Sequence, residues 1–220
     1  MSELPTGSSF DWVRAESWCA TFTRGITPDD VLVRYGAVPG DARVMPKPEA
    51  VRLGADAYRT GAPKSVLRVG SLGDWSFCYE EWGVLGGMSG PLSRLSRGTE
   101  TFTVASNVSM DTFGHWRDGR CTEAFEPDDP GTRQPPPHPW RDALQERREA
   151  GGGSEPGLVA AVRVIGDRMG AVLDDATLDG PLPTVLLGDD RPPRPSRPGG
   201  RGRGAGVLLT DGAGPDAPPA

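Results

Sequence analysis

The chain has 220 residues, of which 36% are hydrophobic and 25% charged, and its formal net charge is -6 at pH 7. It contains no run of about 20 apolar residues, which excludes a membrane-spanning helix, and its 3 cysteines are too few for a disulfide-built scaffold. The negative charge excludes a generally basic nucleic-acid binder, and 31 glycines with 23 prolines predict that part of the chain lies outside a packed core.

Three helices are expected in the N-terminal part of the chain. An apolar side chain recurs every three or four positions across 11–24, which predicts a helix there. A second, short helix is predicted to begin at Thr27-Pro28 and to end at Gly36, because a hydroxyl caps the first N–H groups and proline fits the first turn. The third is predicted over 48–61.

The apolar period then changes to two, which is typical of strands. Strands are predicted over 65–73, 75–83 and 99–106, with one or two helical turns over 91–97 between the second and the third. A last strand is predicted over 184–187.

A hairpin follows the third of these strands. Asp118-Gly119 fits a type I′ turn between two aromatic-bearing strands. Because side chains alternate along a strand, the predicted core face of this hairpin consists of Trp116, Cys121 and Phe125.

Two helices are expected after the hairpin, over 140–150 and 158–172. The predicted fold class is therefore α+β, with N-terminal helices, an antiparallel meander of about five strands, and C-terminal helices on one face. A single domain is expected over 10–188. Residues 189–220 are rich in Arg, Pro and Gly and are predicted to form a disordered tail.

Several central motifs carry a family resemblance. The strand WSFCYEEWG, the turn PLSRLSRGTE and the Asp-Gly hairpin resemble an actinobacterial conserved-domain family of unknown function, over about 10–188. The resemblance implies a bacterial cytoplasmic protein and no established activity.

The residue patterns predict no catalytic residue, no metal ligand set and no cofactor. Metal and nucleophilic sites need several convergent side chains, and His115 and Cys121, which the hairpin brings near each other, fall on opposite faces. The glycine-rich loop 86–90 precedes a helical turn, but it lacks the spacing of a phosphate-binding loop.

The most prominent polar pair is Glu80-Glu81, inside an aromatic strand. Alternation places Glu81 on the face of the aromatic side chains, where a carboxylate must find a partner or have its pKa raised. Arg68, Arg94 or Arg97 could be that partner. Glu80, Glu81, Arg94 and Arg97 are thus the predicted binding residues. A structural Glu–Arg pair, a ligand-facing acidic site and a catalytic acid all remain open.

Charge suggests the function class. Residues 1–190 hold 19 basic and 28 acidic residues, a net charge of -9. Together with the lack of a catalytic constellation, this predicts a non-catalytic cytoplasmic binding or regulatory module that recognises a protein partner, by analogy of the immunity type. The alternative is an enzyme with a carboxylate-centred site near Glu80 and Glu81. Neither a membrane nor a nucleic acid is the expected partner, although the basic stretch 191–204 leaves such attachment as a third hypothesis.

Overall fold

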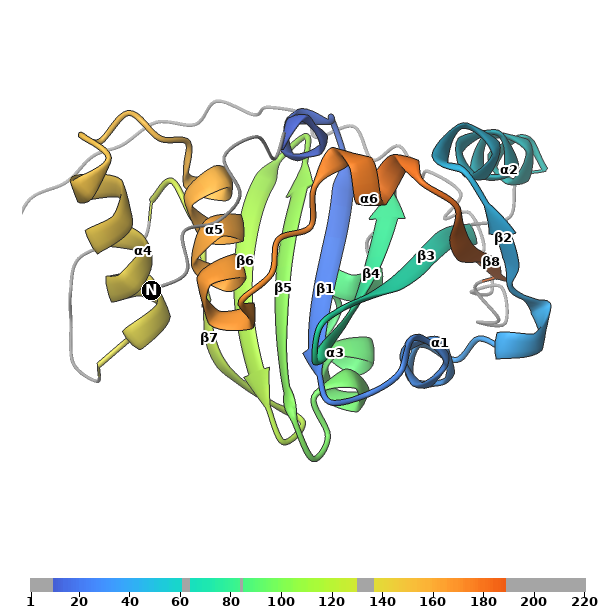
Figure 1. Ribbon diagram of the computed structural model, residues 1–220, viewed down its shortest axis with the longest axis horizontal. Helices are drawn as coiled ribbons and strands as arrows, with labels where there is room; N and C mark the ends of the chain where they lie inside the picture. Colours follow the sequence, from blue (N-terminus) through green and yellow to red (C-terminus); the bar gives the residue numbers. More distant parts are fainter. Residues whose placement is uncertain (1–9, 61–63, 84, 130–136, 189–220) are drawn as a thin grey trace, which may run out of the picture. The chain divides into compact units, whose positions relative to one another are not determined.

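The computed structural model describes residues 10–60, 64–83, 85–129 and 137–188. These residues form an eight-stranded antiparallel sheet with six α-helices (Figure 1). The strands are β1 (Trp18–Arg24), β2 (Arg43–Met45), β3 (Lys64–Leu72), β4 (Trp75–Glu81), β5 (Glu100–Asn107), β6 (Met110–Arg117), β7 (Arg120–Phe125) and β8 (Leu182–Gly188). The helices are α1 (Pro28–Tyr35), α2 (Lys47–Arg59), α3 (Ser89–Leu95), α4 (Pro139–Ala150), α5 (Gly157–Met169) and α6 (Asp175–Asp179), with 3-10 turns η1 (Asp11–Arg14), η2 (Pro39–Asp41) and η3 (Leu85–Gly87).

The α+β class is confirmed, but the sheet is larger than a five-stranded meander. Its strand order is β2-β8-β3-β4-β1-β5-β6-β7. The first strand of the chain lies in the middle, between β4 and β5, and the last inserts between β2 and β3. Sequence periodicity finds individual strands, whereas this order depends on contacts between residues far apart in the chain.

Both faces of the sheet are covered by helices, which corrects the expectation of helices on one face. The aromatic face carries buried side chains of the central strands, including Trp18, Phe22, Phe77, Tyr79 and Phe102, and packs against η1, α4, α5 and α6. On the opposite face, α1 and α3 pack against Leu67, Val69 and Cys78. In Figure 1, α5 and α6 lie in front of the strands and α3 lies behind them.

The helix expected over 11–24 was wrong. Only η1 and then the central strand β1 occupy this range. Six of the seven β1 residues are buried, because helices cover both faces of the sheet. Thr21 and Thr23 do alternate with Ala20 and Phe22, but this alternation is too short to outweigh the helical spacing of the wider range. The apolar residues of this range happen to recur at helical spacing, and this led to the wrong prediction of a helix.

The hairpin turn is confirmed, but its core face is not. Asp118 and Gly119 have φ values of 51° and 80°, as a type I′ turn requires. The register shifts between His115 and Trp116, so β7 contains a bulge. Past the bulge the faces exchange: Phe125 stacks on Phe113 in the core, whereas Cys121 is exposed.

The other predicted helices and strands lie close to their predicted positions, whereas β2 and α6 were not predicted. In α1, Thr27 and Asp30 form a capping box and Gly36 ends the helix with φ 101°. The expected tail, 189–220, lies outside the described residues. No helix in the described part of the chain is both long and apolar enough to cross a membrane.

Candidate functional site

Glu80 lies on the opposite face of β4 and its side chain is completely buried. Its Oε1 accepts the N–H of Gly86 at 2.6 Å, and its Oε2 accepts the N–H of Leu85 at 3.0 Å. Among the described residues Glu80 forms no ion pair, and the partners that hold both of its oxygens include main-chain N–H groups. The arginine partner was expected for Glu81. We call Glu80, Leu85 and Gly86 the Glu80 latch, because the carboxylate holds down the turn that follows β4.

Burial raises the pKa of Glu80 to about 7, although the N–H groups of Gly86 and Leu85 and the hydroxyls of Ser65 and Tyr35 act in the opposite direction. The Tyr35 hydroxyl also lies 3.0 Å from that of Thr21. The surroundings of the carboxylate are therefore polar, but no cation from the described ranges lies close enough to keep it charged.

Two thiols share this buried region, and neither is activated. Burial, and then the charge of Glu80, raise the pKa of both Cys19 and Cys78. A reactive cysteine needs a lowered pKa and some exposure. Both thiols therefore act as small core side chains.

The turn over Glu80 approaches the carboxylate too closely to admit a side chain. A Cβ on Gly86 would lie 2.7 Å from Tyr35 Oη and 2.8 Å from Cys19 Sγ. A Cβ on Gly83 would collide with the Glu80 carboxylate itself. The main chain therefore occupies the space in which a ligand of Glu80 would have to bind.

Glu81 lies on the aromatic face, as alternation predicted, and is half-buried. Its charge opposes the lowering of the Arg68 pKa that burial causes. Arg68 is fully buried and donates to main-chain carbonyls of Leu178, Gly180 (2.8 Å) and Met45 (3.3 Å). Arg68 thus connects β3 to α6 and to the end of β2. Glu81 is its nearby countercharge.

Arg94 and Arg34 connect the C-terminal ends of α1 and α3. The Arg94 Nε donates to the Arg34 carbonyl at 2.6 Å, at the C-terminus of α1. In return, Arg34 donates to the carbonyls of Leu95 (2.8 Å) and Arg97 (3.0 Å), at the C-terminus of α3. These bonds satisfy carbonyls that a helix leaves free at its end. The Arg97 side chain is exposed, so the structure does not bring the four predicted binding residues together.

A second buried carboxylate, Glu100, was not singled out from the sequence. It lies at the start of β5 on the aromatic face and is 4% exposed. Its partners are cationic: Arg168 at 2.6 Å and Arg24 at 3.5 Å, with His115 Nε2 also 3.5 Å away.

The His115 ring belongs to the core. Its centroid lies 4.7 Å from that of Phe102 and 5.1 Å from that of Trp140, and its Nδ1 lies 2.5 Å from the Thr122 hydroxyl. Burial lowers the pKa of His115, against the effect of Glu100. Glu100 and His115 together connect α4 and α5 to the sheet.

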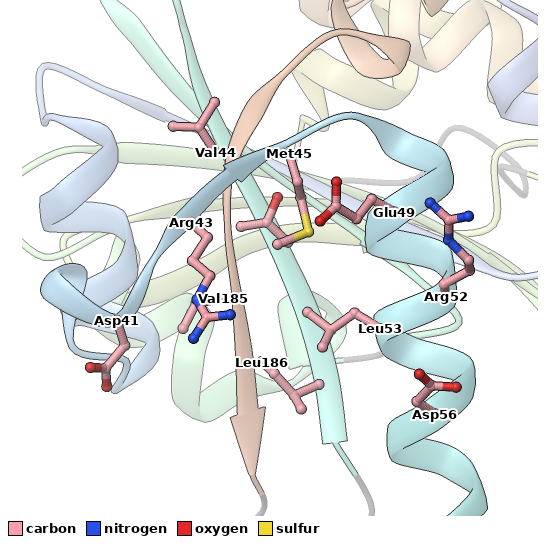
Figure 2. Close-up of a pocket in the computed structure, with 11 residues that line it drawn as sticks. Asp41, Arg43, Val44, Met45, Glu49, Arg52, Leu53, Asp56, Val185 and Leu186 are labelled. Atoms are coloured by element: carbon pink, nitrogen blue, oxygen red, sulfur yellow. The ribbon is translucent and has the colours of Figure 1, made fainter.

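A hollow of about 610 Å³ lies between α2 and the sheet edge formed by β2 and β8 (Figure 2). We call it the edge groove. Its charged lining residues are Asp41, Arg43, Glu49, Arg52 and Asp56. Leu53 and Leu186 point into the space between α2 and β8 and give the groove an apolar floor.

The edge groove runs beside main-chain groups that the sheet leaves open. Val44 of β2 pairs with Pro183, which has no N–H, so the hydrogen-bonded pairs are those on either side of it. The N–H and C=O of Val44 therefore point outward. By the same alternation the N–H and C=O of Leu186 point away from β3, and no described strand pairs with β8 there.

The family of unknown function DUF6461 matches residues 6–152. The chain belongs to this family. No curated protein and no solved structure matches the chain. The DUF6461 match runs from before η1 to the end of α4 and thus includes β2 and α2, whereas β8 lies outside it.

The sequence did not reveal the edge groove. β2 has only three residues, too few to show a period of two, and β8 reaches it from about 140 positions further along the chain. The one available signal is Pro183 in the predicted last strand, because proline in a strand favours a position near a sheet edge.

Proposed function

We propose that this protein is a binding module without catalytic turnover, and that it recognises another protein at the edge groove. The observation that carries the proposal is the open main-chain edge at Val44 and Leu186, directly beside a charged hollow with an apolar floor. Open strand edges pair readily with other chains, so proteins use them for recognition or protect them.

The charge of the molecule supports a basic partner. Residues 1–190 have a net charge of -9, and the groove is lined by three carboxylates and two arginines. Opposite charge steers partners together and favours the correct one over like-charged competitors. An immunity-type role, in which an acidic protein masks a basic one, is consistent with this charge.

The enzyme alternative rested on the Glu80-Glu81 pair. Glu80 is fully buried beneath its own turn, and both carboxylate oxygens accept main-chain N–H groups. A general acid must come within hydrogen-bond reach of a substrate. We therefore assign Glu80 to the stability of the fold rather than to a reaction.

Affinity capture with three full-length proteins tests the proposal. The wild type and Glu146→Lys, an exposed substitution on α4, should retain the same basic protein at low salt and release it at high salt. Glu49→Lys makes the same charge change in the groove and should lose that protein. Equal capture by Glu49→Lys, or no specific partner for any of the three, would contradict the proposal.

A further inference from the structure

The edge of the sheet beside α2 is only partly covered. β2 pairs with β8 from Leu182 to Thr184 and no further. Extending this register would place Asp41 opposite Leu186, but Asp41 belongs to the 3-10 turn η2, which leads the chain away from the sheet. Among the described residues, β8 therefore has no neighbour on this side from Val185 to Gly188, a length of about 13 Å at the usual strand rise.

The orientation of the β8 peptide groups determines what this length of strand can do. Val185 and Leu187 pair with Leu67 and Ser65 and direct their N–H and C=O groups to β3. Leu186 directs its own to the uncovered side. A strand laid beside Leu186 would gain main-chain hydrogen bonds without displacing any that the described sheet already makes.

The residues that line the edge groove determine which side chains an added strand could carry there. Alternate residues of an added strand would point to the aromatic-face side, over Leu53 and Leu186. Asp41 and Glu49, which form no ion pair among the described residues, lie on either side of this floor, and Figure 2 shows them on η2 and α2. Although Arg43 and Arg52 also line the groove, the two carboxylates without an ion pair favour basic side chains on either side of an apolar one.

We propose, building on the proposed function, that the edge groove binds an extended basic segment of the partner protein as an added β-strand beside Leu186 of β8. The main-chain bonds to Leu186 provide sequence-independent affinity, and the floor and carboxylates provide selectivity. A second copy of this chain is a poorer occupant, because it would bring two bodies of charge -9 together.

Amide hydrogen exchange of the full-length protein, resolved by residue, tests the main-chain part of the proposal. In the free protein the Leu186 amide should exchange at least about 100-fold faster than that of Val185, because only the latter is bonded within the sheet. A Leu186 amide already protected in the free protein would show that the chain itself or a second copy covers the edge, and would overturn the proposal.

Peptides selected from a random dodecapeptide library on the wild-type protein provide the probe. The selected peptides should carry Lys or Arg around an apolar residue and should slow the exchange of the Leu186 amide. Two versions of a selected peptide would be compared, one methylated at the backbone nitrogens of odd-numbered residues and one at those of even-numbered residues. Only one of the two should lose binding, because alternate N–H groups of an added strand face β8. Failure to select a peptide, or selected peptides that protect other residues, would overturn the strand-addition proposal.

The Glu49→Lys and Glu146→Lys variants distinguish failure of the strand-addition proposal from failure of the proposed function. Glu49→Lys should weaken the selected peptide about tenfold, the equivalent of one lost charge interaction, while Glu146→Lys leaves it unchanged. A partner that is captured and lost on Glu49→Lys without any change at Leu186 would retain the edge groove as the binding site and refute strand addition alone.

Discussion

The Glu80 latch and the edge groove differ in what their polar groups contact. Both oxygens of Glu80 accept main-chain N–H groups at 2.6 and 3.0 Å, inside a fully buried environment. At the groove, the peptide group of Leu186 and the side chains of Asp41 and Glu49 have no such partner among the described residues. Polar groups that are already satisfied hold a fold together, whereas accessible unsatisfied groups are the ones that can recognise something else.

Two of the buried carboxylates, Glu80 and Glu100, make a related point. Glu80 is held by N–H groups on the opposite face, and Glu100 by Arg168, Arg24 and His115 on the aromatic face. A glutamate in an aromatic strand can therefore be satisfied in two physically different ways, and residue type alone does not distinguish a structural role from a binding role.

The largest expected effect is on stability at the latch. Glu80→Ala should lower the free energy of unfolding by about 3–5 kcal/mol at pH 5, because it leaves two buried N–H groups without an acceptor and opens a cavity. Glu81→Ala, one residue away but half-buried, should cost about 1 kcal/mol. Urea denaturation of both variants measures this, and equal losses would remove the distinction between the two residues.

The pH dependence of stability probes how Glu80 is satisfied. Its folded-state pKa of about 7 lies above the ordinary value of 4.5. The folded protein therefore binds more protons than the unfolded chain between these values, so the contribution of Glu80 is fully present below pH 4.5 and is lost as pH rises to about 7.

Glu80→Gln removes this titration. The stability deficit of Glu80→Gln relative to wild type should shrink by roughly 3 kcal/mol between pH 4.5 and pH 8, since each pKa unit is worth about 1.4 kcal/mol. If an arginine held Glu80 instead, its pKa would be lowered, and the deficit would stay nearly constant over this range, because its pH dependence would lie below pH 4.5. Denaturation curves of both proteins across this range distinguish a shrinking deficit from a constant one.

A smaller loss is expected when the turn of the latch is crowded. Gly86→Ala should cost about 1–3 kcal/mol, because its Cβ would meet Tyr35 and Cys19 at distances that force a shift. Gly87→Ala is the control: it has nothing within 4 Å and should change stability by less than about 0.5 kcal/mol. Thermal and chemical denaturation of the two variants measure these effects. If neither substitution changed the stability, the turn would be looser than described.

The smallest stability effect is expected at the edge groove. Glu49→Lys, in the first turn of α2, and Asp56→Lys, which removes the ion pair with Arg59, change exposed side chains and should each cost no more than about 1 kcal/mol. A loss of several kcal/mol in either variant would mean that the groove, like the latch, serves the fold.

Local signals predicted much of the secondary structure. The capping box at Thr27, the Asp118-Gly119 turn and the alternation in β3 and β4 are encoded by neighbouring residues. They did not reveal β1, because its short alternation lies within a range of apolar residues at helical spacing. They also did not reveal the bulge in β7, because one inserted residue exchanges the faces without changing the turn.

The candidate site was less accessible to sequence reasoning. Alternation correctly separated Glu80 from Glu81, but the partners of Glu80 are main-chain N–H groups, which every residue except proline possesses and no sequence pattern marks. Arg94 was predicted as a binding residue, yet its acceptors lie 60 positions away at the end of α1. The edge groove depends on the insertion of β8 beside β2, which is a property of topology alone.

One affinity measurement tests the central claim that Glu80 holds the fold while the edge groove recognises the partner. The selected peptide is titrated at pH 8 into folded wild type, Glu80→Gln and Glu49→Lys. The claim predicts an unchanged dissociation constant for Glu80→Gln and one about tenfold weaker for Glu49→Lys. Unchanged binding by Glu49→Lys together with lost binding by folded Glu80→Gln would contradict it and return the site to the acidic pair.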